Sequence, residues 1–170
     1  MKTWGSIKYH FSGKDGLLEA AIDYATKDWQ RDPMGSYLKQ NEKLFDAADG
    51  QRKLVCGVID IFMNMVFMKE KPAWCGVLLF QVLHQDIPVC KKIYNSCSVP
   101  TIEAFRSLYE RITGSADPQM AFCWMAMTFS PTVRLLSPDS QRYANPLYPV
   151  QDSTRAIMHE MTIRCALVNL

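Results

Sequence analysis

Helical spacing of apolar residues is the feature that most constrains what this chain can fold into. Between residues 54 and 68 the apolar side chains recur every three or four positions, at Leu54, Val58, Ile61, Met65 and Met68. No stretch shows the sustained apolar–polar alternation that a half-buried strand requires. Glycine, proline, asparagine and aspartate stand at the breaks between the periodic segments, as they do between helices. The sequence therefore predicts an all-α fold.

Helix boundaries are expected where prolines and glycines occur. The predicted helices cover residues 3–10, 13–31, 41 or 50 to 69, 72–85, 88–113, 118–136 and 153–170. Asp32-Pro33 is expected to stop a helix, because the residue before a proline disfavours helical geometry, and a loop is expected over 33–40. Pro100 is expected to kink or split its helix, and Gly114 to end it. The segment after Pro72 is apolar nearly all round, which predicts a central helix.

Composition places the chain among globular proteins with a sizeable core. It has 170 residues, 48% of them hydrophobic and 21% charged, and a formal net charge of +2. This charge argues against a nucleic-acid binder that uses its whole surface, although it allows a small basic patch. No secretory signal is expected at Met1, and the apolar stretch over 55–68 is too short and too polar to span a bilayer. A cytoplasmic protein without a membrane partner is expected.

Reactive side chains are scattered in the sequence. The six cysteines form no C-x-x-C pair, and the histidines at 10, 84 and 159 lie in unrelated contexts. No nucleophile elbow, phosphate loop, metal-spaced His/Cys set or dinucleotide-binding glycine pattern is present. Cys–His nucleophilic chemistry stays open, since its partners need not be adjacent in sequence. We therefore expect reduced, mostly buried cysteines, and no enzyme, metal or cofactor.

One short stretch near the start carries more specific information. Residues 5–22 read GSIKYHFSGKDGLLEAAI, in which a short helix, a Ser12-Gly13 turn and a longer helix are expected. The amides of the second helix N-terminus, with Lys14 beside them, and the polar side chains of the first helix suit contacts to a phosphate backbone. The alternative is an ordinary helical corner in which His10 has a structural hydrogen bond.

This stretch resembles the recognition helix and the following helix of the tetracycline-repressor (TetR) family of bacterial transcriptional regulators. The matching residues are Gly5, Ser6, Ile7, Tyr9, His10, Phe11, Lys14, Asp15, Leu17 and Leu18. Lys8 replaces the most frequent aromatic residue, as is typical of a subgroup resembling the CecR regulators. Residues 78–105, LLFQVLHQDIPVCKKIYNSCSVPTIEAF, resemble the C-terminal domain of that subgroup.

The resemblance implies a repressor whose binding to operator DNA is relieved by a small-molecule ligand. Residues 1–32 would form part of a helix-turn-helix region, and residues 41–170 a helical regulatory and dimerisation domain. Family members have further helices before the recognition helix, including the one that braces it. On this comparison the chain is truncated within its helix-turn-helix and is expected to bind DNA poorly. The alternative is a DNA-independent ligand-binding and dimerisation module, or a dominant-negative remnant of a regulator.

The resemblance also implies three sets of site residues. DNA would be contacted by Lys2, Thr3, Trp4, Ser6, Lys8, Tyr9, His10 and Lys14. An apolar inducer would lie in a pocket, rich in methionine and aromatic residues, that is lined by Phe62, Met65, Trp74, Leu78, Gln81, His84 and Tyr94. A homodimer would form through Phe122, Met125, Ala126, Phe129, Ile157, Met161 and Cys165. For both the pocket and the interface sets, the alternative is that the side chains belong to the core of one chain.

Overall fold

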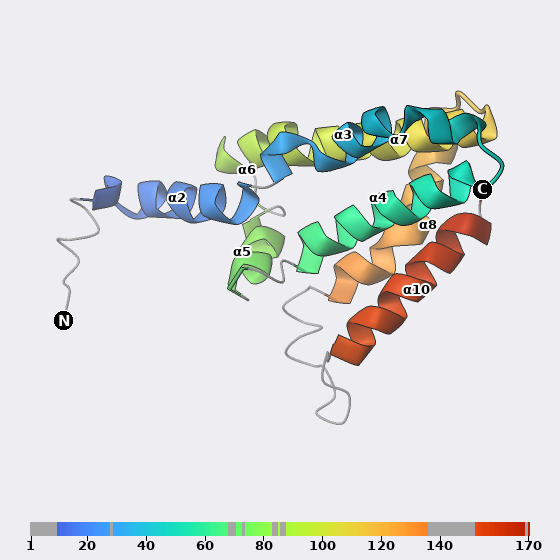
Figure 1. Ribbon diagram of the computed structural model, residues 1–170. Coiled ribbons are helices and arrows are strands. Elements are labelled where there is room, and N and C mark those ends of the chain that lie inside the picture. Colours follow the sequence, from blue (N-terminus) through green and yellow to red (C-terminus); the bar gives the residue numbers. More distant parts are fainter. Residues whose placement is uncertain are drawn as a thin grey trace.

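Every regular element of the computed structural model is helical, which confirms the predicted all-α fold (Figure 1). The structure describes residues 10–27, 29–67, 71–72, 74–82, 85, 88–135, 152–168 and 170. The elements are α2 (Lys14–Thr26), η1 (Trp29–Arg31), α3 (Pro33–Gln40), η2 (Glu42–Asp46), α4 (Gly50–Phe67), α5 (Trp74–Val82), α6 (Pro88–Ile93), the π-helical η3 (Tyr94–Ser98), α7 (Val99–Thr113), α8 (Pro118–Leu135) and α10 (Asp152–Val168).

The expected loop over residues 33–40 is wrong, because this segment is helix α3. Asp32 does not begin a loop. Its carboxylate accepts a hydrogen bond from the Gly35 amide at 3.1 Å and so caps the N-terminus of α3. Pro33 follows at the first helical position, where no amide is needed. The Asp-Pro pair is thus a start signal for α3 as well as a boundary of the preceding segment.

The helix predicted over residues 13–31 is shorter than expected. Helix α2 ends at Thr26, and only a short 3-10 turn covers Trp29–Arg31. The Lys71 ammonium, from the segment before α5, donates to the carbonyl oxygens of Tyr24 and Ala25 at 2.8 and 2.9 Å. A distant side chain therefore satisfies carbonyls that the last turn of a helix leaves open.

The predictions for Pro100 and Gly114 are confirmed. The helix over residues 88–113 is interrupted just before Pro100, where the Val99 amide bonds to the Tyr94 carbonyl in a π-turn. Proline has no amide for the carbonyl four residues earlier, so the wider turn relieves the break. Gly114 ends α7 in the left-handed conformation, with φ of 71°.

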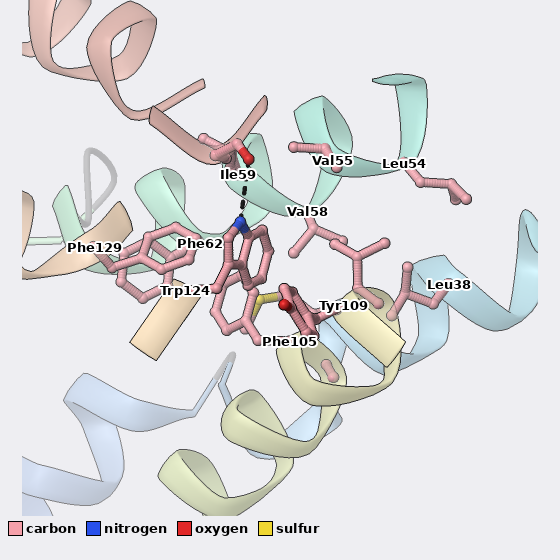
Figure 2. Packing of buried hydrophobic residues seen from close by; sticks show 14 of the residues in the cluster. Leu38, Leu54, Val55, Val58, Ile59, Phe62, Phe105, Tyr109, Trp124 and Phe129 are labelled. Carbon is pink, nitrogen blue, oxygen red and sulfur yellow. Dashed lines mark hydrogen bonds between the residues drawn. The ribbon is translucent and has the colours of Figure 1, made fainter. Parts of the chain in front are cut away.

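The larger hydrophobic cluster, here called the main core, joins α3, α4, α7, α8 and α10. Its centre is aromatic: the Phe105 ring lies 4.3 Å from Phe129 and 5.6 Å from Phe62, measured between centroids (Figure 2). Leu54 and Leu108 of the same core are completely buried. Helix α8 is therefore held on α4 and α7 by aromatic packing, and α10 joins the same core through Ala166.

A smaller cluster, here called the second core, joins α2, α5, α6 and η3. Its buried residues are Ile22, Ala25, Cys75, Leu79, Val82, Cys90, Ile93 and Cys97. The apolar helix α5 was expected at the centre of the molecule, and this is wrong, because it packs mainly on α2 and leaves Trp74 46% exposed. Helix α5 is apolar because it packs with α2 and α6 in the second core, and it does not belong to the main core.

Candidate functional site

Helices α8 and α10 carry six large apolar side chains that are exposed. Each of them is between 49% and 83% exposed: Met120, Phe122 and Met127 of α8, and Ile157, Met161 and Val168 of α10. On α10 the spacing of four and seven residues places all three on one stripe. On α8, Met120 and Met127 share a stripe, whereas Phe122, two residues after Met120, lies on another side of the helix. We call these six exposed side chains together the α8–α10 face.

Specific polar contacts position the two helices that carry this face. The Trp124 indole Nε1 donates to the Ala166 carbonyl oxygen at 3.1 Å, and the Thr132 and Thr162 hydroxyls lie 3.1 Å apart in the buried seam. His159 of α10 also contacts α4, where its Nε2 lies 2.5 Å from Asp60 Oδ1. Because these contacts join α10 to both α8 and α4, the exposed face is supported by a fixed pair of helices.

The predicted dimer residues divide between this face and the interior. Phe122, Ile157 and Met161 are exposed, while Met125, Ala126 and Cys165 are partly exposed. Phe129 is only 4% exposed and packs against Phe62 and Phe105 in the main core. The sequence prediction left out Met120, Met127 and Val168. A seven-residue spacing places two residues on the same side of a helix, and it relates Met120 to Met127 and Met161 to Val168, so this pattern could have identified them.

The structure does not bring the predicted inducer-pocket residues together. Phe62 and Met65 pack in or against the main core, whereas Leu78 packs against the second core. Trp74 and Tyr94 are about half exposed, and Gln81 is exposed. His84 lies outside the described residues. The set divides because α4 and α5 contribute to different cores.

A cavity of about 460 Å³ lies instead between α2 and α6. It is lined by Asp15, Gly16, Leu18, Glu19, Pro88, Val89 and Lys92. This volume suits a small ligand. Sequence reasoning missed the cavity because its two walls are about seventy positions apart in the chain, so no local pattern joins them.

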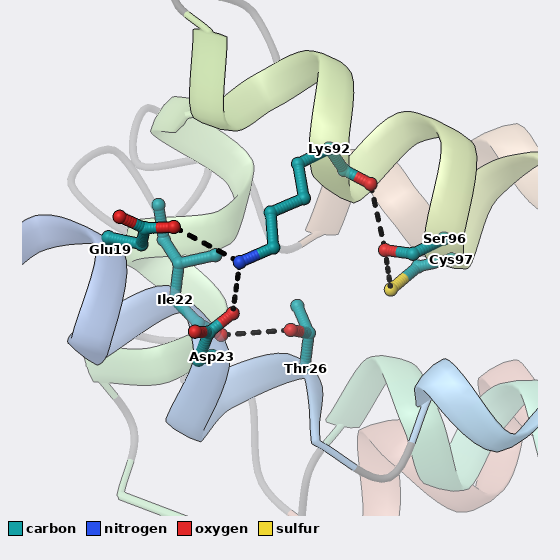
Figure 3. A network of polar contacts seen from close by, with 7 residues as sticks. All are labelled: Glu19, Ile22, Asp23, Thr26, Lys92, Ser96 and Cys97. Atoms are coloured by element: carbon teal, nitrogen blue, oxygen red, sulfur yellow. Dashed lines mark hydrogen bonds and ion pairs between the residues drawn. The ribbon is translucent and has the colours of Figure 1, made fainter.

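The lysine at this cavity is held by two carboxylates of α2. Lys92 Nζ lies 3.1 Å from Glu19 Oε1 and 3.4 Å from Asp23 Oδ1 (Figure 3). The hydrogen bonds that Lys92 donates to Glu19 and, to a lesser extent, to Asp23 raise its pKa above the ordinary value of 10.5. Lysine 92 therefore stays charged throughout the neutral range and links α6 to α2.

Most of the predicted DNA contacts, namely Lys2, Thr3, Trp4, Ser6, Lys8 and Tyr9, lie outside the described residues. The other two, His10 and Lys14, are exposed on either side of the turn before α2. In this turn Ser12 and Gly13 have φ of 56° and 110°. Gly16 comes close to the same turn, since a Cβ there would stand 1.7 Å from the Phe11 carbonyl oxygen. Glycine is thus required for the approach of α2 to the preceding chain.

The described part of the chain holds no group of three or more histidine, cysteine or acidic side chains placed to bind a metal ion. None of the six cysteines, all of which the structure describes, is in a disulfide. Within the same residues no helix has both the length and the apolar character needed to cross a membrane. No protein-family model matches the chain, and no curated protein is significantly similar to it in sequence.

Proposed function

We propose that this chain is a transcription regulator of the kind that its N-terminal sequence resembles, the TetR family. In this proposal it acts in the bacterial cytoplasm as a homodimer that binds operator DNA and releases it when a small apolar ligand binds. It catalyses no reaction and uses no cofactor or metal. The observation that carries the proposal is the α8–α10 face.

The exposed side chains favour a second copy as the occupant of this face. Scattered surface apolar residues are normal, but large ones gathered on two neighbouring helices indicate an interaction site. Homodimer interfaces are richer in apolar area than other surfaces, and they use methionine and aromatic side chains at their centre. Phe122, Met127 and Met161 are of this type and are each about half exposed or more.

The turn before α2 supports a link to DNA. Lys14 stands in the first turn of a 13-residue helix, where a cation and free amides together suit a phosphate group. Lys71, from the segment before α5, holds the end of α2, and Lys92 of α6 holds its side. A shift in α6 or in the segment that carries Lys71 would therefore change the position of α2 and of the turn before it.

The alternative is a helical dimerisation and ligand-binding module that does not bind DNA. It is favoured by the α8–α10 face and the α2–α6 cavity, because an apolar surface and a space for a small ligand serve such a module without any contact to DNA. Enrichment of a palindrome from a random duplex library would support the regulator. A dimer that enriches no sequence at low or high salt would support the module, because even specific DNA binding weakens steeply with salt.

Oligomeric state tests the dimer directly. We expect the wild-type chain to sediment as a dimer at micromolar concentration and Ile157→Glu to sediment as a monomer with an unchanged far-UV circular dichroism spectrum. Tyr94→Glu is the matched control, since Tyr94 is 52% exposed on η3, away from the α8–α10 face. A monomeric wild type, or an Ile157→Glu chain that stays dimeric, would refute the assignment of this face.

A further inference from the structure

The two cores share no residue and are built from different helices. Helices α2, α5 and α6 contribute to the second core, whereas α3, α4, α7, α8 and α10 contribute to the main core. Helix α2 packs on α5 in the first group, and α10 packs on α4 and α8 in the other. Figure 1 shows the first group gathered at one end of the molecule.

The chain passes between the groups through two unusual pieces of backbone. The first is Asp32, between η1 and α3, which has φ of 44° and ψ of 63°. A non-glycine residue in the left-handed region is strained, and such strain persists only where its surroundings impose it. The hydrogen bond from the Gly35 amide holds Asp32 there.

The second is the π-turn over Tyr94–Ser98, between α6 and α7. Cys97 of this turn belongs to the second core, while Ala104 and Phe105, one to two turns later, belong to the main core. Mid-helix departures from α geometry of this kind mark hinges and functional sites more often than ordinary helix does. The third connection, over residues 68–73, lies largely outside the described residues.

Few of the interactions that the structure describes close the second group. Among the side chains it describes, eight are buried in the second core and seventeen in the main core, and cores with few apolar contacts open first. The Lys92 contacts to Glu19 and Asp23 add a fastening between α6 and α2, with side chains about half exposed (Figure 3). Exposed ion pairs of this type are weak and are screened by salt.

We propose that α2, α5 and α6 open as one unit, separately from the main core, about Asp32 and the π-turn, with the Lys92 contacts as a salt-sensitive latch that joins α6 to α2 within the unit. This motion goes beyond the proposed function and does not depend on DNA binding or on dimerisation. It assigns the Asp32–Pro33 and Tyr94–Pro100 segments the role of hinges. It also places the α2–α6 cavity wholly inside the moving unit.

Amide hydrogen exchange on the full chain tests the unit and its latch. We expect the amides of α2, α5 and α6 to exchange through a common opening, faster than those of α4, α8 and α10. Lys92→Met should accelerate exchange in α2, α5 and α6 together by roughly two- to fivefold, and Lys92→Arg should restore most of the protection. Lys39→Met, an exposed lysine of α3, is the control and should change neither group.

Pro100→Ala tests the hinge. An amide at this position can bond to the Ser96 carbonyl and continue the helix, so we expect slower exchange in α2, α5 and α6. Equal exchange in both groups of helices, or equal acceleration of both by Lys92→Met, would overturn the proposal of a separate unit. An unchanged pattern in Pro100→Ala would overturn the hinge at the π-turn. A loss of DNA binding would leave these exchange results unaffected.

Discussion

Trp124 is the side chain whose replacement should report most directly on how the α8–α10 face is held. It is 3% exposed, and its ring contacts Phe105, Tyr109 and Phe129 of the main core. Its indole N–H donates to the carbonyl oxygen of Ala166. That carbonyl is among the last four of α10, for which the helix itself supplies no amide. Trp124 of α8 therefore supplies a hydrogen bond to a carbonyl oxygen at the C-terminal end of α10.

Trp124→Phe removes this hydrogen bond while keeping an aromatic ring in place. A buried acceptor left without a partner costs about 1–3 kcal/mol. The smaller ring adds about 1 kcal/mol, at ~24 cal/mol for each Å³ of cavity. We therefore expect the free energy of unfolding to fall by about 2–4 kcal/mol, which corresponds to a melting temperature lower by about 4–16 °C for a chain of this size.

Urea unfolding followed by far-UV circular dichroism, at one fixed protein concentration, measures this loss. The fixed concentration matters because a dimer would gain stability by mass action. Trp74→Phe is the matched control, since Trp74 is 46% exposed and should change stability by less than about 0.5 kcal/mol. A Trp124→Phe chain as stable as the Trp74→Phe chain would show that the indole bond does not hold α10.

Two further predictions concern backbone and thiols. Gly114→Ala should lower the free energy of unfolding by about 1–2 kcal/mol, because φ at this position is 71°. Gly76→Ala should raise the free energy of unfolding by about 0.4–1 kcal/mol, because a helical Cβ there meets no atom within 4 Å. If the urea midpoints of Gly114→Ala and Gly76→Ala moved in the same direction, these two predictions would be contradicted. Burial raises the pKa of Cys97 above its ordinary value of 9.0. Its contribution to stability is therefore complete below pH 9.0 and is lost as pH rises through the folded-state pKa. Above pH 9.0 the urea midpoint should therefore fall less steeply with pH in Cys97→Ala than in the wild type. An equal slope in both chains would show that burial does not raise the pKa of Cys97.

Local signals in the sequence were sufficient where one residue decides the geometry. Gly114 ends α7 because only glycine adopts a left-handed conformation at low cost, and the break before Pro100 follows from the missing amide. Asp32-Pro33 misled the prediction because the same pair can end one helix and begin the next. The choice depended on a cap to Gly35 that the sequence pattern alone does not reveal.

The candidate site was only partly accessible from the sequence. Phe122 and Phe129 lie on one helix, seven residues apart, and both were assigned to the dimer interface, yet one is 61% exposed and the other 4%. The sequence marks both as apolar but does not say that α4 and α7 supply Phe62 and Phe105 to cover the second. The α2–α6 cavity was out of reach for a related reason, since Lys92 and Glu19 meet only in the folded chain.

The sequence by itself determined that this protein is helical and where several of its helices break, because periodicity and the backbone limits of proline and glycine act over a few residues. Only the tertiary structure decided which apolar faces are covered. Burial depends on a partner helix that is distant in the chain, and this is why two separate cores, the Lys92 contacts and the exposed α8–α10 face emerged from the folded arrangement alone.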